Sequence, residues 1–334
     1  MKSRREFLKD AATGAVLLSA AKLALPGAAE AHAAARKSRV VIARDAALSA
    51  NGGQPDEQRV LNLLDKAMAA FTGRDTPIEA WKSVVPASIL NGKVIGLKVN
   101  GLGGRGISTH AALTMAVAER LQQAGVRAGN ILVWDRGARD LEACGMTVNS
   151  DLSRVRCYGS DVGGYEDEPV ECGAAQVRLA KILTRECAMT INLPILKDHE
   201  MAGVTFAMKN MYGVVDKPFL LHDNHCNPGV ADLNAIPAVR EKASFTIGDA
   251  ISSVYDGGPR FNPERLWFPN ALIVGKDRVA VDHAAWQMIE RKRAEAGVPT
   301  LEAAGRAPSY IATAADGAHR LGTCDPRRMK LMEV

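Results

Sequence analysis

Short apolar runs that alternate with amphipathic helical patterns restrict the fold more than any other feature of this chain. Four of these runs have the length and composition of buried strands: residues 39–44, 93–99, 130–135 and 271–275. Apolar residues at helical spacing follow the first two, in residues 56–71 and 110–123. Strand, helix and strand of these lengths form right-handed βαβ units. We therefore predict an α/β fold with a mainly parallel, Rossmann-like sheet flanked by helices.

Residues 189–213 contain the strongest candidate for a site. The apolar run there reaches Pro194, and a proline at this point indicates that the strand is leaving its sheet. Lys197, Asp198 and His199 follow directly. Ligands bind just beyond the carboxyl ends of the strands in open α/β sheets. We therefore expect a ligand cleft at this strand end.

Lys197 and His199 are two residues apart, so an extended chain directs both side chains to one side and Asp198 to the other. A lysine beside a histidine can clamp a carboxylate or a phosphate, or act as an acid–base pair. A solvated loop is the alternative interpretation.

A helix that ends at Gly213 is expected next. Its buried residues recur at helical spacing: Val204, Met208, Met211 and Tyr212. Lys209 lies away from this stripe. It either stabilises the negative end of the helix, an effect of about 0.3 to 1 kcal/mol, or contacts an anion together with Lys197.

A glycine-rich turn at residues 101–106 leads into the helix of residues 110–123. Backbone N–H groups at such a turn can hold a phosphate, and we take Gly103, Gly104 and Arg105 as candidates for cofactor contact. The glycine spacing fits neither the dinucleotide fingerprint nor the Walker motif. The alternative is a flexible loop that ends in a Ser/Thr helix cap.

The chain becomes irregular around residues 200–240, which we interpret as an insertion into the α/β domain, with a helix at residues 230–239. Three side chains there could share a transition metal such as zinc, copper or iron: His222, His225 and Cys226. His199 could complete the set. Exposed loop histidines and a disulfide-bonded cysteine are the alternatives. The six cysteines include no C-x-x-C pair, so a compact iron–sulfur motif is not expected.

Several acidic residues follow strand ends or precede helices: Asp135, Asp249, Asp256 and Asp282. Carboxylates at such positions can hold a divalent ion, act as a general base, or cap a helix or turn. Asp277 is expected to cap the helix that follows residues 271–275.

The first 35 residues have the pattern of a targeting segment. Residues 3–9, SRREFLK, match the twin-arginine signal, and a mildly apolar stretch follows at residues 11–25. That stretch is too short and too rich in alanine to span a bilayer stably. We expect the twin-arginine machinery to export the protein to the periplasm or another exported location. The mature part, residues 36–334, is expected to form a single α/β domain.

The charge of the chain bears on its partners. Without residues 1–35 it has 37 Lys and Arg against 34 Asp and Glu. So weak a positive balance argues against a nucleic-acid partner and leaves a small molecule or an anion as the expected ligand. Since the twin-arginine route carries proteins that are already folded, a bound cofactor is favoured without being identified.

Two segments together resemble the core signature of the domain-of-unknown-function family 362: residues 191–199, INLPILKDH, and residues 208–213, MKNMYG. Three further segments extend the resemblance to about residues 40–290: residues 97–100, 248–259 and 274–282. Residues 222–233, in the irregular insertion, resemble exported members of the family. The family would more often carry a histidine at Met211, and some relatives carry a cysteine-rich ferredoxin segment that is absent here. The resemblance implies no reaction.

These observations lead to one main hypothesis and two others. We expect a cleft at the strand ends to bind an anionic substrate or cofactor. Four residues are expected to contact it: Lys197, His199, Lys209 and Asn210. Asp249 or Asp282 is expected to assist. An enzyme is favoured, and its reaction stays open. The second hypothesis is a periplasmic metal- or ligand-binding protein without catalysis. The third is an accessory partner of a redox complex.

Overall fold

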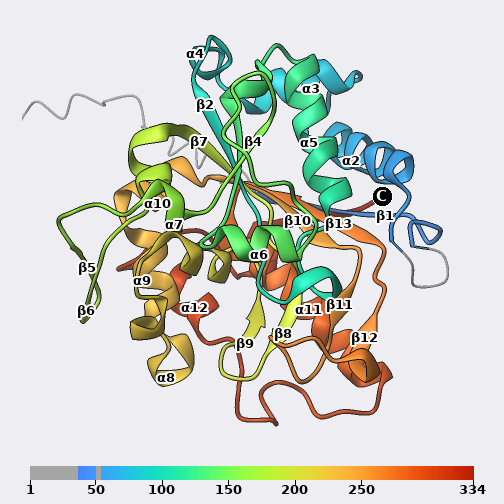
Figure 1. Ribbon diagram of the computed structural model, residues 1–334. Helices are drawn as coiled ribbons and strands as arrows, with labels where there is room; N and C mark the ends of the chain where they lie inside the picture. Colours follow the sequence, from blue (N-terminus) through green and yellow to red (C-terminus); the bar gives the residue numbers. More distant parts are fainter. Residues whose placement is uncertain (1–36, 50–53) are drawn as a thin grey trace, which may run out of the picture. The chain divides into compact units, whose positions relative to one another are not determined.

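The computed structural model (Figure 1) describes residues 37–49 and 54–334, except for the side chain of Arg105. The predicted twin-arginine segment, residues 1–35, lies outside the described residues. Residues 37–334 form one compact unit. Among the residues described, no helix is long and apolar enough to cross a membrane.

An eight-stranded sheet runs through this unit in the order β14-β1-β13-β10-β7-β2-β3-β4. Its strands, in chain order, are β1 (Ser38–Arg44), β2 (Val94–Lys98), β3 (Ile131–Trp134), β4 (Arg156–Cys157), β7 (Cys187–Asn192), β10 (Phe245–Ala250), β13 (Ala271–Gly275) and β14 (Met329–Glu333). Neighbours are parallel except around β13, which is antiparallel to both β1 and β10. The predicted α/β fold with a mainly parallel sheet is confirmed.

The sheet is buried on both faces, as the apolar strands indicate. Successive side chains of β1 point in opposite directions. Val41 and Ala43 belong to the core on one face, and Val40 and Ile42 belong to the core on the other. Strands buried on two sides read as continuous apolar runs rather than as an alternation, which is why these segments are visible in the sequence.

Helices cover the two faces of the sheet (Figure 1). One face packs against α2 (Glu57–Thr72), α3 (Pro77–Val84) and α5 (Ala111–Gln123). The other packs against α9 (Gly229–Ala235), α10 (Pro237–Lys242), α11 (Arg278–Glu295) and α12 (Tyr310–Ala315). The remaining α-helices have one or two turns: α4 (Ala87–Leu90), α6 (Ala138–Ala143), α7 (Ser160–Gly163) and α8 (Asp223–Cys226).

Small hairpins and tight helical turns complete the unit. The hairpins pair β5 (Val170–Cys172) with β6 (Ala175–Val177), β8 (Lys197–His199) with β9 (Gly203–Thr205), and β11 (Ser253–Val254) with β12 (Leu266–Trp267). A π-helical turn, η4, spans Ile182–Glu186. The 3-10 turns are η2 (Gly104–Gly106), η3 (Ala128–Asn130), η5 (Lys209–Val214), η6 (Pro218–Leu221), η7 (Pro263–Arg265) and η8 (Pro326–Arg328).

Helix caps explain where the longer helices begin. The Asp56 carboxylate accepts from the N–H of Arg59 at the start of α2, and Gly73 ends that helix in a left-handed conformation, φ 71°. Asp277 accepts from the N–H groups of Val279 and Ala280 at the start of α11. The predicted cap at Asp277 is thus confirmed.

The segment before Gly213 does not form the predicted helix. Val204 lies in β9, because Gly203 adopts φ 74° and turns the chain back along β8. The N–H of Ala207 donates to the Asp282 carboxylate at 2.6 Å instead of to a preceding helical turn. Only the short 3-10 turn η5 follows. The helical prediction was wrong here because a carboxylate from a distant helix takes over the backbone donors.

The structure also corrects the predicted helix at residues 230–239 and shows the state of the cysteines. The helix expected at residues 230–239 is two helices, since α9 ends at Ala235 and Pro237 opens α10; proline has no N–H to continue the first. All six cysteines are free, and five of them are buried.

Candidate functional site

A cavity of about 290 Å³ lies at the carboxyl ends of β2, β3 and β7. The chain passes from β2 to β3 on one side and reaches β7 on the other, so this edge is a topological switch point of the sheet. The β8–β9 hairpin lies beyond these strand ends (Figure 1). This is the strand end at which the sequence predicts a cleft.

Lys197 and His199 line the cavity, whereas Asp198 points to the other side of β8. The Lys197 ammonium donates to the Asn100 side chain at 3.1 Å and to the carbonyls of Leu102 at 2.5 Å and Ile107 at 3.2 Å. Three acceptors use all three of its N–H groups. When protonated, Lys197 therefore places a positive charge in the inner wall and has no free N–H for a ligand.

Burial lowers the pKa of Lys197 to about 7; Asp135 opposes this shift, and the positive charge of Lys209 adds to it. The oxygens that surround this ammonium are neutral, so they leave its positive charge uncompensated, which strains the site electrostatically. Among the described residues, no carboxylate forms an ion pair with Lys197 or with Lys209. A negative charge in the cavity would relieve this strain.

A second buried lysine, Lys98, shows the contrasting arrangement. Its ammonium contacts the Asp135 carboxylate at 2.6 Å and the Val99 carbonyl at 2.8 Å. The other Asp135 oxygen accepts from the Gly101 N–H at 2.7 Å. Gly213 leaves room for this pair, since a Cβ there would lie 2.6 Å from the Asp135 oxygen. Lys98 is thus neutralised within the protein.

Asn210 ties the strand ends together. Its amide donates to the Asn192 side chain at 2.7 Å and to the Lys98 carbonyl at 3.2 Å, and its oxygen accepts from Asn100 at 3.1 Å. Asn192 in turn donates to the Ala207 carbonyl at 2.8 Å. Because these groups satisfy one another, Asn210 positions the cavity wall more than it offers a contact to a ligand.

Lys209 is the cavity lysine with donors to spare. It is 5% exposed, its Nζ lies 3.8 Å from the centre of the Tyr212 ring, and His222 Nε2 lies 3.4 Å from that Nζ. Burial lowers the pKa of Lys209 to about 8, with Cys226 acting in the opposite direction. An ammonium in this setting can contact an anion directly.

The hydrogen bonds of the two cavity histidines fix their neutral tautomers. His222 Nδ1 lies 2.9 Å from the Pro218 carbonyl and must donate to it, so Nε2 carries the lone pair. His199 Nδ1 accepts from the N–H groups of Met201 and Ala202, at 3.1 and 3.2 Å, so its proton is on Nε2. The two rings are 6.1 Å apart.

Burial and the nearby lysines keep both rings neutral. Burial lowers the pKa of His199 to about 2, and the positive charge of Lys209 is the second largest contribution to this decrease. The pKa of His222 is lowered by burial first and by Lys209 second. The cavity thus presents the Lys209 ammonium and the His199 Nε2–H as donors. This arrangement suits a carboxylate or a phosphate oxygen.

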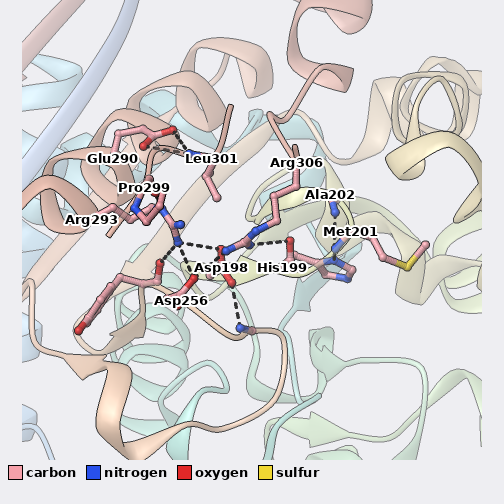
Figure 2. A network of polar contacts seen from close by, with 12 residues as sticks. Asp198, His199, Met201, Ala202, Asp256, Glu290, Arg293, Pro299, Leu301 and Arg306 are labelled. Carbon is pink, nitrogen blue, oxygen red and sulfur yellow. Dashed lines mark hydrogen bonds and ion pairs between the residues drawn. The ribbon is translucent and has the colours of Figure 1, made fainter. Parts of the chain in front are cut away.

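A network of ion pairs on the far side of β8 holds these residues in place (Figure 2). Asp198 is fully buried and contacts Arg306 at 2.5 Å, and its other oxygen accepts from the Gly258 N–H at 2.9 Å. Arg306 and Arg293 both reach Asp256, at 2.7 Å each. Burial raises the pKa of Asp198 to about 6, against the opposing effect of Arg306. By holding Asp198 on the far side of β8, the network keeps the side chains of Lys197 and His199 directed toward the cavity.

Asp249 and Asp282 do not line the cavity. Asp249 is fully buried and accepts from the His110 N–H at 2.8 Å and from His110 Nδ1 at 2.9 Å, where α5 begins. Asp282 accepts from the N–H groups of Ala207 and Met208. Both carboxylates therefore support the elements around the site. Neither of these predicted catalytic residues contacts the cavity.

The glycine-rich turn borders the cavity through Leu102. Gly103 and Gly104 adopt φ 124° and 65°, conformations that favour glycine. The turn directs the carbonyls of Leu102 and Ile107 toward Lys197, so it solvates an ammonium where the sequence suggests a phosphate cradle. The side chain of Arg105 lies outside the described part of the structure.

The predicted metal ligands are placed differently from one another. His222 lines the cavity, His225 is exposed and lies with Nδ1 3.0 Å from the Met201 carbonyl, and Cys226 is fully buried. Over residues 37–49 and 54–334, no three His, Cys, Asp or Glu side chains gather closely enough to hold a metal ion.

Sequence reasoning missed several residues that build the site: Lys98, Asn100, Asn192, Phe219 and Arg306. One signal was available for Lys98, because a lysine inside a buried apolar strand requires a partner. Asn100 follows the same strand by two residues. The other three come from separate segments whose meeting depends on the fold.

Similarity to known proteins concerns the family and the fold. A crystal structure of a protein from Thermotoga maritima is similar over 71% of this chain and 59% of its own, with 12% sequence identity and a TM-score of 0.43. This chain therefore spans less than two thirds of that protein. No curated protein matches the chain. The family described as a domain of unknown function (DUF362) matches residues 95–287, more than half of the sequence. The chain belongs to the DUF362 family.

Proposed function

We propose that the protein binds a small anionic ligand in the cavity at the strand ends. The Lys209 ammonium and the His199 Nε2–H contact the anion, and Lys197 adds a positive charge behind them. The observation that carries the proposal is the presence of two buried ammonium groups at one cavity without a carboxylate paired to either in the described structure.

The energetic argument rests on the contrast among the three buried lysines. Removing an ammonium from water costs several kcal/mol unless an opposite charge compensates for it. Asp135 compensates for Lys98 at 2.6 Å. Lys197 and Lys209 have neutral partners instead. An anionic ligand supplies the missing compensation, and it raises the pKa of both amines when it binds.

The same geometry favours an enzyme over a passive carrier. Burial lowers the pKa of Lys209 to about 8, so this amine can exchange a proton near neutral pH. Perturbed lysines in a cavity are typical of catalytic sites. His222 Nε2 lies 3.4 Å from the Lys209 amine and accepts from it.

Calorimetric titration of residues 36–334 with sodium acetate and with inorganic phosphate tests the proposal. We expect at least one of these anions to bind to the natural protein and to lose most of its affinity in Lys209→Met, which keeps the length of the side chain without its charge. Lys330→Met, on the exposed part of β14, is the matched control and should bind normally. Binding that is equal in both variants would overturn the proposal, as would no binding to the natural protein.

We also propose that the twin-arginine machinery exports this protein to the periplasm. The support is the sequence of residues 1–35. Replacing both Arg4 and Arg5 with lysine should retain the protein in the cytoplasm of a bacterial host, whereas Lys22→Arg should leave export unchanged. Export of the double variant at the normal level would disprove this assignment.

A further inference from the structure

We infer that the ligand is an amphipathic anion: a carboxylate joined to one compact apolar group about the size of an aromatic ring. This inference rests on the proposed anion site and identifies the class of molecule that the same cavity accepts.

The cavity has two buried lysines at its inner end and two large apolar side chains, with the exposed Arg136, at its mouth; Asp135 and Asp140 also line it. Lys209 and Lys197, at its inner end, are 5% and 0% exposed. Leu102 and Phe219 also line it, but they are 60% and 65% exposed. Residues that line a cavity and remain exposed must lie at its opening. A ligand that enters the cavity therefore places its charge inward and meets these two side chains with its outer part.

The apolar residues at the mouth come from separate segments. Phe219 and Pro218 belong to the turn η6, Leu102 belongs to the glycine-rich turn, and Pro259 follows the β11 segment. No core cluster of the described chain contains Leu102 or Phe219. Two large apolar side chains that serve no core and line the same cavity favour an apolar ligand group at its opening.

The volume limits the size of this group. An apolar cavity of about 150 Å³ holds one benzene molecule. The cavity here, at about 290 Å³, is nearly twice that size and has room for a ring and a carboxylate. Acetate and phosphate leave the mouth filled with water against Leu102 and Phe219. A dinucleotide exceeds the cavity.

Three probes separate the contribution of the charge from that of the ring. Benzoate has both, acetate has the charge alone, and benzamide has the ring without the charge. Calorimetry or ligand-observed NMR at pH 7 measures their affinities for residues 36–334. We expect benzoate to bind at least about tenfold more tightly than acetate, because the ring loses its contact with water. We expect a similar advantage over benzamide.

Two variants locate these contributions. Phe219→Ala should reduce the advantage of benzoate over acetate by at least about threefold. Lys209→Met should remove the advantage of benzoate over benzamide. Leu152→Ala is the control for Phe219→Ala, since it truncates an apolar side chain that is 73% exposed and does not line the cavity. Because Phe219 is largely exposed, its truncation leaves the fold intact, which thermal unfolding verifies.

The outcomes distinguish this inference from the proposed function. If acetate and benzoate bind equally and both depend on Lys209, the anion site stands and the amphipathic ligand is excluded. An unchanged advantage of benzoate in Phe219→Ala also overturns the inference. If no probe depends on Lys209, the proposed function itself fails.

Discussion

His222 presents an unprotonated Nε2 to the Lys209 ammonium at 3.4 Å, because its Nδ1 donates to the Pro218 carbonyl at 2.9 Å. A neutral imidazole is thus the nearest polar partner of a buried cation. This contact solvates Lys209 without neutralising it. The positive charge remains available to a ligand, and protonation of His222 would place two cations side by side.

A buried charge that serves a ligand should lower the stability of the free protein. We predict that Lys209→Met raises the free energy of unfolding by about 1 to 3 kcal/mol without ligand, since methionine fills the space without a desolvated charge. Urea unfolding at pH 7 measures this difference. Lys242→Met is the matched control, because Lys242 donates to the carbonyls of Leu183 and Thr184 at 2.8 and 2.7 Å and is only partly buried. We expect no gain there, and a loss of stability in Lys209→Met would contradict the idea.

The affinity for an anion should fall as the pH rises through about 8. Burial lowers the pKa of Lys209 to about 8, so the ammonium is present below this pH and is lost above it. We predict a gradual decline in benzoate affinity from pH 6 to 8, as Lys197 with its pKa of about 7 loses its charge, and a further loss of up to about tenfold per pH unit above the pKa of Lys209. In Lys209→Arg, the charge at residue 209 persists, and this further loss should disappear. A decline that is identical in this variant would assign the titration to another group.

The lowered pKa of Lys209 also affects stability: the free energy of unfolding should increase with pH, whereas the affinity for the anion decreases. In the unfolded chain lysine titrates near its ordinary value of 10.5, whereas folded Lys209 titrates at about 8. Between these values the unfolded state binds more protons, so the free energy of unfolding increases with pH. Comparison of urea unfolding at pH 8 and pH 10 should show this increase, and the increase should be smaller in Lys209→Met.

The parts of the fold that were predictable depend on local patterns. β2 and β13 are apolar runs between turn residues, and Asp277 caps α11 through donors two and three residues away. The placement of Lys197 and His199 on one side of β8 also follows from the alternation of an extended chain. Each of these features is encoded within a few neighbouring residues.

The remaining features depend on residues far apart in the sequence. β9 replaces the predicted helix because Asp282 takes the N–H of Ala207, 75 residues away. β14 was not predicted because it forms by pairing with β1 at the edge of the sheet. The cavity mouth brings together Leu102 and Phe219 from distant parts of the sequence. Such contacts have no local pattern, so they become visible only in the folded chain.

Asn210 should matter for stability more than for charge recognition. We predict that Asn210→Ala lowers the free energy of unfolding by about 2 to 4 kcal/mol, because the buried side-chain N–H of Asn100 and the side-chain oxygen of Asn192 lose their hydrogen bonds to Asn210. Asn62→Ala on the exposed face of α2 should change stability by less than about 0.5 kcal/mol. An Asn210→Ala protein of natural stability that fails to bind benzoate would instead indicate direct contact with the ligand.

Arg306 should stabilise the site from behind β8. We predict that Arg306→Met costs about 3 to 5 kcal/mol, because Asp198 then remains buried without its 2.5 Å partner. Burial already raises the pKa of Asp198 to about 6, and loss of Arg306 raises it further. A raised pKa means that the folded state retains a proton the unfolded state has lost, so the variant should lose stability as the pH rises from 5 to 8. Adding Asp198→Asn should remove that pH dependence. Arg59→Met breaks the exposed pair with Asp45 and should cost less than about 1 kcal/mol; equal costs in the two arginine variants would show that the network in Figure 2 does not hold the site.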